Sequence, residues 1–126
     1  MEIKNTSVVM DTSILAVEGR CRLVGVQIGI GDPSRLQSKG VAQAMDDCTI
    51  VLTDGSSGGD TLFKVGIQGS GAEAYGVGVN PMSFMLGDRR ILFESGIYVN
   101  QMGSSSGSAT KLDRDLVYLS IFYEGA

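Results

Sequence analysis

The sequence predicts an all-β fold, an antiparallel β-sandwich or jelly roll with about seven or eight short strands and no long helix. Three observations favour this class. Glycine supplies 18 of the 126 residues, about double its average share of roughly 7%, and its clusters divide the chain into short segments. Those segments are apolar and rich in β-branched residues. Turn signals separate them about every 8 to 15 residues, as in all-β domains.

The first predicted strands lie in the first 30 residues. An apolar, β-branched run extends over 7–17 and is interrupted at Asp11, and a second run covers 20–30. Alternation in the second run predicts two faces. One face carries Val24, Val26, Ile28 and Ile30, and the other carries Leu23, Gly25, Gln27 and Gly29.

Further strands follow from the same apolar pattern. Residues 48–53 and 61–67 flank the turn DGSSGGD and predict a β-hairpin. Weaker signals at 72–79 and 82–86 precede a predicted strand at 91–99. The final run, LVYLSIFY at 116–123, is the strongest strand signal, and at a sheet edge it would need cover.

The length fits one domain over residues 1–126. Within it we expect a possible N-terminal arm at 1–6 and long loops at 31–46 and 100–115. Long excursions from a compact β domain are common sites of contact with partners.

The composition excludes several function classes. The net charge is −4, so the chain lacks the basic field that binding to DNA or RNA requires. It has no histidine, which removes the commonest general base and the usual imidazole metal ligand. No serine, aspartate pair or glycine motif forms a recognised catalytic or nucleotide-binding pattern. We therefore expect no enzyme activity, no cofactor and no resident metal.

Two features of the sequence leave alternatives open. Cys21 and Cys48 both fall in apolar runs, which favours buried free thiols over a disulfide. The 54–60 turn offers oxygen atoms from Asp54, Ser56 and Asp60, which calcium accepts as ligands, although any tight turn uses the same residue types.

Partner contacts are expected at apolar residues outside the clear strands, together with the N-terminal arm. Methionine in particular adapts to a partner surface, although it also fills gaps in cores. The candidates are Pro33, Leu36, Val41, Met45, Met82, Phe84 and Met85.

Several short motifs in order resemble a set of small virion proteins of tailed phages. They are GRCRLVGV at 19–26, Asp54-Gly55 followed by Leu62-Phe63, ILFESGIYV at 91–99 and a closing FYE at 122–124. The resemblance implies a non-enzymatic β-sandwich subunit of a phage particle. The sequence departs from the pattern by its long 31–46 segment and its enlarged 100–115 segment.

The resemblance and the composition together predict a capsid decoration or cement protein that stabilises the shell by binding major capsid protein. We expect a homo-oligomer, with a trimer as the guess, assembled in the host cytoplasm and located in the virion. No signal sequence or membrane-spanning run is evident, so no membrane partner is expected. The alternatives are a tail, fibre or neck component, or a β-sandwich module that binds carbohydrate or protein.

Overall fold

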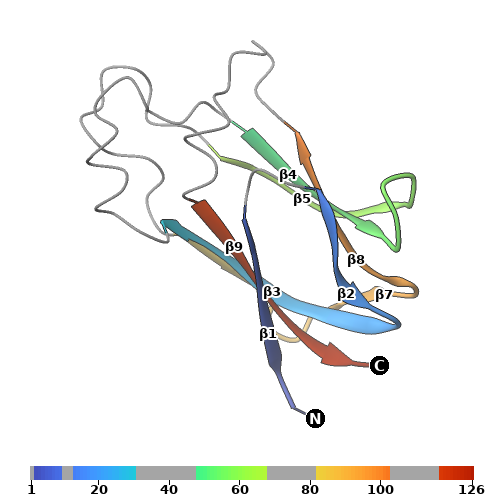
Figure 1. The fold of residues 1–126 in the computed structure, drawn as a ribbon. Helices are drawn as coiled ribbons and strands as arrows, with labels where there is room; N and C mark the ends of the chain where they lie inside the picture. Colours follow the sequence, from blue (N-terminus) through green and yellow to red (C-terminus); the bar gives the residue numbers. More distant parts are fainter. Residues whose placement is uncertain (1, 10–12, 31–47, 68–81, 103–116) are drawn as a thin grey trace, which may run out of the picture.

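The computed structural model describes residues 2–9, 13–30, 48–67, 82–102 and 117–126. This part of the chain holds nine strands in two antiparallel sheets, stacked face to face (Figure 1). The predicted all-β sandwich is confirmed, with nine strands in place of seven or eight. The described residues contain no helix long and apolar enough to span a membrane.

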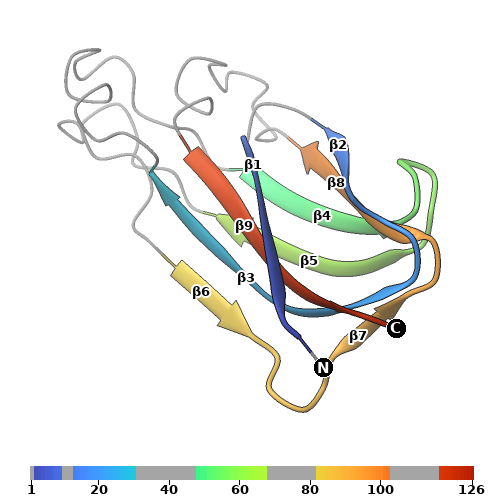
Figure 2. The same ribbon diagram turned by 60° about the horizontal axis from the view of Figure 1, so that its bottom comes forward.

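The five-stranded sheet has the order β1-β9-β3-β6, and β7 also pairs with β3. Its strands are β1 (Lys4–Val9), β3 (Cys21–Ile30), β6 (Met82–Met85), β7 (Ile91–Phe93) and β9 (Val117–Gly125). β6 and β7 pair with successive parts of β3, so together they line one side of that strand (Figure 2).

The four-stranded sheet has the order β2-β8-β4-β5. Its strands are β2 (Ile14–Glu18), β4 (Cys48–Asp54), β5 (Thr61–Ile67) and β8 (Gly96–Met102). Leaving β7 aside, the chain passes between the two sheets at every connection except β4–β5. Two four-stranded antiparallel layers wound in this way form a jelly roll, an architecture found in viral capsid and lectin domains.

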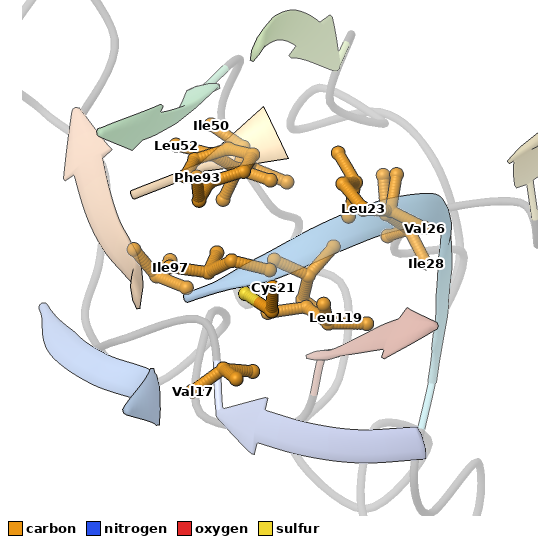
Figure 3. Close-up of a cluster of buried hydrophobic side chains, with 12 residues drawn as sticks. Val17, Cys21, Leu23, Val26, Ile28, Ile50, Leu52, Phe93, Ile97 and Leu119 are labelled. Carbon is orange, nitrogen blue, oxygen red and sulfur yellow. The ribbon is translucent and has the colours of Figure 1, made fainter. Parts of the chain in front are cut away.

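The core lies between the sheets and consists mainly of aliphatic side chains from both layers, together with Phe93 and Cys21 (Figure 3). Its fully buried members include Leu23, Val26 and Ile28 of β3 and Ile50 and Leu52 of β4. Burying a side chain of this size stabilises the fold by about 1.5–3 kcal/mol. The apolar residues of the predicted strands therefore supply the core.

A β-bulge changes the predicted faces of β3. Opposite β9, Leu23 pairs with Tyr123 and Gly25 pairs with Phe122, so Val24 is the extra residue. The bulge brings Leu23 into phase with Val26 and Ile28, and all three are buried in the core. The alternation had placed Leu23 on the opposite face, which is wrong because simple alternation assumes an unbroken ladder.

Two apolar runs are each divided between the sheets, although only the second, at 91–99, was predicted as a single strand. The 7–17 run contributes to β1 in one sheet and β2 in the other, and the 91–99 run contributes to β7 and β8. The second division occurs at Gly96, which has φ +116° and lies against the Val17 carbonyl, where a side chain would not fit. The chain crosses between layers at this glycine.

The expected N-terminal arm at 1–6 is also wrong in part. Lys4, Asn5 and Thr6 belong to β1 and pair with β9, so they form the edge of the sheet.

β9 itself lies between β1 and β3 and is an inner strand, so it needs no subunit to cover it. The 100–115 loop begins later than expected, because residues 100–102 belong to β8. Residues 31–46, 72–79 and 103–115 lie outside the described part of the chain.

The two ends of the sandwich differ in how the strands are joined. At one end the connections are short, such as the turn at Gly19-Arg20 and the corner at Glu94-Ser95. At the opposite edge of the sandwich, β1, β3, β5 and β8 finish (Figures 1 and 2). The strand that follows each of them along the chain begins at the same edge. The segments 10–13, 31–47, 68–81 and 103–116 all leave and rejoin the described strands there.

Candidate interface surfaces

The outer face of the five-stranded sheet is the largest candidate surface among the described residues. Register and burial together assign its side chains, because residues that alternate with the core residues point outward. Four of these outward residues are large and apolar or aromatic, and one of them, Leu92 on β7, is half-buried opposite Arg22. Met85 is 55% exposed, Tyr118 is 38% exposed, and Phe122 is half-buried.

Met85 owes its position to a glycine on the neighbouring strand. Gly25 pairs with Met85, and a Cβ on Gly25 would collide with the Met85 sulfur and lie 2.7 Å from the Phe84 carbonyl oxygen. The missing side chain therefore lets β6 lie close to β3 while Met85 covers the glycine on the outer face. Phe84 points the other way and packs against the core.

The predicted contact residues thus have different outcomes. Met85 is exposed on the outer face, as a contact residue must be, whereas Phe84 is a half-buried neighbour of the core. Met82 begins β6, and its side chain is not among those described. Pro33, Leu36, Val41 and Met45 lie outside the described residues and stay predictions.

A partly buried ion pair lies at the short-turn end of the same face. Glu124 is 6% exposed, and its carboxylate accepts a 2.6 Å hydrogen bond from the Arg90 guanidinium. Arg22 is the cross-strand neighbour of Glu124 on β3. Nothing in the sequence indicates this pair, since its members are 34 residues apart and no motif links them.

The turn at 54–60 is held by hydrogen bonds within the protein. The Asp54 carboxylate accepts hydrogen bonds from the backbone N–H groups of Ser95 at 2.8 Å and Glu94 at 3.3 Å. The Ser56 carbonyl accepts bonds from the Gly59 N–H and the Thr53 hydroxyl. Within the described residues no group of three or more acidic, Cys or His side chains is placed to hold a metal. Oxygen atoms from two of the three residues considered as calcium ligands, Asp54 and Ser56, therefore already have protein donors.

A polar network covers the outer face of the four-stranded sheet beside this turn. The Asn100 amide donates to the Thr53 hydroxyl oxygen at 2.9 Å and to the Ser57 carbonyl at 3.4 Å. The Thr53 hydroxyl in turn donates to the Ser56 carbonyl at 2.6 Å. These bonds hold the turn against its own sheet. The polar residues on this part of the face therefore have a role in the fold and give no sign of a binding site.

Cys21 is a free thiol in the core, 2% exposed, which confirms half of the cysteine prediction. Burial and the nearby Asp54 carboxylate raise the pKa of the Cys21 thiol above 9.0, because both disfavour the thiolate. Cys48 begins β4, but its side chain is not among those described.

The sheets and their winding define the class of the domain, an antiparallel jelly-roll sandwich. No family model matches the sequence, and no curated protein matches it. A chain in the X-ray crystal structure of tomato aspermy virus aligns with a TM-score of 0.47 and 8% identity, over 99% of this chain and 78% of that one. A likeness this distant gives no information about function. The assignment of the fold depends on the strand order and register of this chain.

Proposed function

We propose that this chain is a non-enzymatic structural protein of a virion, and more specifically a capsid decoration or cement protein of a tailed phage. The proposal is supported chiefly by where the phage-like motifs lie in the fold. GRCRLVGV covers the β2–β3 turn and the first part of β3, and ILFESGIYV covers β7, the corner and the first part of β8. The Asp54 of the hairpin motif bonds to that same corner.

The departures from the phage pattern lie elsewhere in the sandwich. The enlarged 31–46 and 100–115 segments join strands at the end opposite the short turns. A shared framework with altered connections at one end is what we expect of shell-binding subunits that recognise different capsid lattices. Fold alone does not define function, so the motifs and their placement carry this proposal, and the jelly roll is compatible with it.

The mechanism we propose is binding without chemistry. A subunit that binds only the assembled shell stabilises it by mass action, in proportion to its concentration relative to its Kd. The proposed contact set for the shell is the 31–46 segment with Pro33, Leu36, Val41 and Met45. Major capsid protein is the proposed partner.

The first test is the copy number of this protein in purified particles, measured by mass spectrometry against the major capsid protein. We expect hundreds of copies. A number from a few to a few tens would instead assign the protein to the tail, fibre or neck. Complete absence would overturn the virion proposal and favour a carbohydrate- or protein-binding module, which a sugar-dependent rise in Tm would support.

A second test concerns the contact segment. Replacing residues 31–46 by a glycine–serine linker of equal length should leave the domain folded and abolish binding to particles stripped of this protein. Ser57→Arg, in an exposed turn at the opposite end, is the matched control and should still bind. Retained binding by the linker variant would remove this segment from the proposed contact surface.

A further inference from the structure

The outer face of the five-stranded sheet carries two adjacent cross-strand rows with no charged residue. Ser7, Ser120, Gln27 and Ser83 form the middle row, in which the Ser7 and Ser120 hydroxyls bond at 2.9 Å. Asn5, Phe122, Gly25 and Met85 form the row toward the short-turn end. Tyr118 lies on β9 on the other side of the middle row.

The absence of charge from these rows is unusual for a sheet face in contact with water. Charged residues make up 19% of the chain, and the charged groups near this face, Arg22, Arg90 and Glu124, gather beyond the Phe122 row. Protein interfaces share two of these features, because charge is depleted at their centre and aromatic residues and methionine are enriched.

We propose that this face binds the same face of a second copy of the chain, around a two-fold axis that lies along the middle row. The axis is parallel to the sheet and perpendicular to β9. Tyr118 and Phe122 lie two residues on either side of Ser120 on the outward side of β9. Rotation about the axis therefore places Tyr118 of each copy over Phe122 of the other, which is the reciprocal contact that a two-fold interface requires.

The rows also favour a second copy over a charged partner. A face without charge offers nothing to select an acidic or basic surface, whereas the small polar side chains of the middle row can bond to their own symmetry equivalents. Burial of Tyr118 against Phe122 would remove two partly exposed aromatic rings from water. Aromatic pairs of this kind contribute beyond their buried area.

The size of the face fits a reversible dimer. Four strands spaced about 4.8 Å apart and up to about 30 Å long give a flat area of roughly 500 Å² per copy. Side chains that project from the sheet increase the accessible surface beyond this value. Two such faces together reach about 1,000 Å², the lower limit for a specific interface. We therefore expect association that depends on protein concentration and lies at the weak end of the range for such complexes.

This inference deepens the proposed function, because it assigns a surface to the homo-oligomer and replaces the trimer guess with a two-fold dimer. Its test needs only the free protein, so its failure is distinguishable from a failure of the virion proposal. Sedimentation velocity over a wide concentration range should show a monomer–dimer equilibrium. Tyr118→Asp should raise the dimer Kd at least about tenfold, because the interface would have to bury a carboxylate.

Cross-linking tests the position of the axis. Sheets packed face to face lie about 10 Å apart, so a short bismaleimide should link Ser120→Cys into a dimer. Lys64→Cys, on an exposed position of the other sheet, is the matched control, and the unchanged chain reports linking through its own cysteines. A monomer at all concentrations, a trimer, or equal linking at both positions would overturn the proposal. Unchanged far-UV circular dichroism of Tyr118→Asp would show that loss of the dimer is not loss of the fold.

Discussion

The carboxylate of Asp54 accepts a hydrogen bond from the backbone N–H of Ser95 at 2.8 Å, although the two residues are 41 positions apart. Asp54 ends β4 in the four-stranded sheet, and Ser95 lies in the corner through which the chain passes from β7 to β8. A bond from Glu94 and a backbone bond from the Gly55 N–H to the Gly96 carbonyl lie beside it. This cluster fixes the crossing between the two layers.

Removing the Asp54 carboxylate should therefore destabilise the sandwich. We expect Asp54→Ala to lower the free energy of unfolding by about 1–3 kcal/mol, since two backbone donors lose their acceptor. Asp54→Asn keeps one carbonyl oxygen and should cost less. Urea unfolding measures both, with Asp60→Ala as the control at an exposed position of the same turn. Equal losses for Asp54→Ala and Asp60→Ala would contradict the proposed role.

Calcium should leave the stability unchanged. Both Asp54 carboxylate oxygens and the Ser56 carbonyl already accept hydrogen bonds in the folded protein, so a cation would have to displace protein donors. We expect the same Tm in millimolar calcium and in a chelator. A rise in Tm with calcium that is lost in Asp60→Asn would instead show that the turn is a calcium site.

The Arg90–Glu124 pair should contribute much more than the exposed pair between Arg20 and Glu94. Arg90→Ala leaves the Glu124 carboxylate buried without its cation, and we expect a loss of about 2 kcal/mol. Arg20→Ala should cost less than about 1 kcal/mol, because its side chain is 51% exposed and that of Glu94 is 62% exposed.

A double variant separates charge burial from packing at this site. Arg90→Met combined with Glu124→Leu removes both charges and should recover most of the stability lost in Arg90→Ala, as measured by urea unfolding. If the double variant is no more stable than Arg90→Ala, the loss comes from packing rather than from an unpaired charge.

A methyl group on Gly25 should displace β6. Its Cβ would meet the Phe84 backbone as well as the flexible Met85 side chain, so the strand has to move. We expect Gly25→Ala to cost about 1–3 kcal/mol and to raise hydrogen exchange in β6. Gly58→Ala is the control, since nothing lies within 4 Å of its Cβ position. Unchanged exchange in β6 would show that the two strands tolerate a wider spacing.

Cys21 should make stability fall at alkaline pH. The folded protein holds the thiol proton more tightly than the unfolded chain does, because burial raises the Cys21 pKa above 9.0. Its contribution is complete below about pH 9 and decreases as the pH rises further, when the unfolded chain ionises first. Cys21→Ala should show a smaller decline above pH 9 in urea unfolding. The same decline in both proteins would assign the effect to other groups.

Local pattern predicted the elements better than it predicted their partners. The β4–β5 hairpin and the long β3 follow from alternation and turn residues, and the structure has both. The divided 91–99 run could have been read from Gly96, since a glycine within an apolar run indicates a bend. The outer face could also have been read from the alternation of Leu119 and Ile121 with Tyr118 and Phe122.

The amino-acid sequence by itself determined the all-β class and most of the strands, because glycine spacing and apolar periodicity act locally. Only the tertiary structure decided the bulge at Val24, the inner position of β9 and the pairing of Arg90 with Glu124. Each of these depends on contacts between segments far apart in the chain. Their energies are set by which strands become neighbours, and a local pattern does not contain that information.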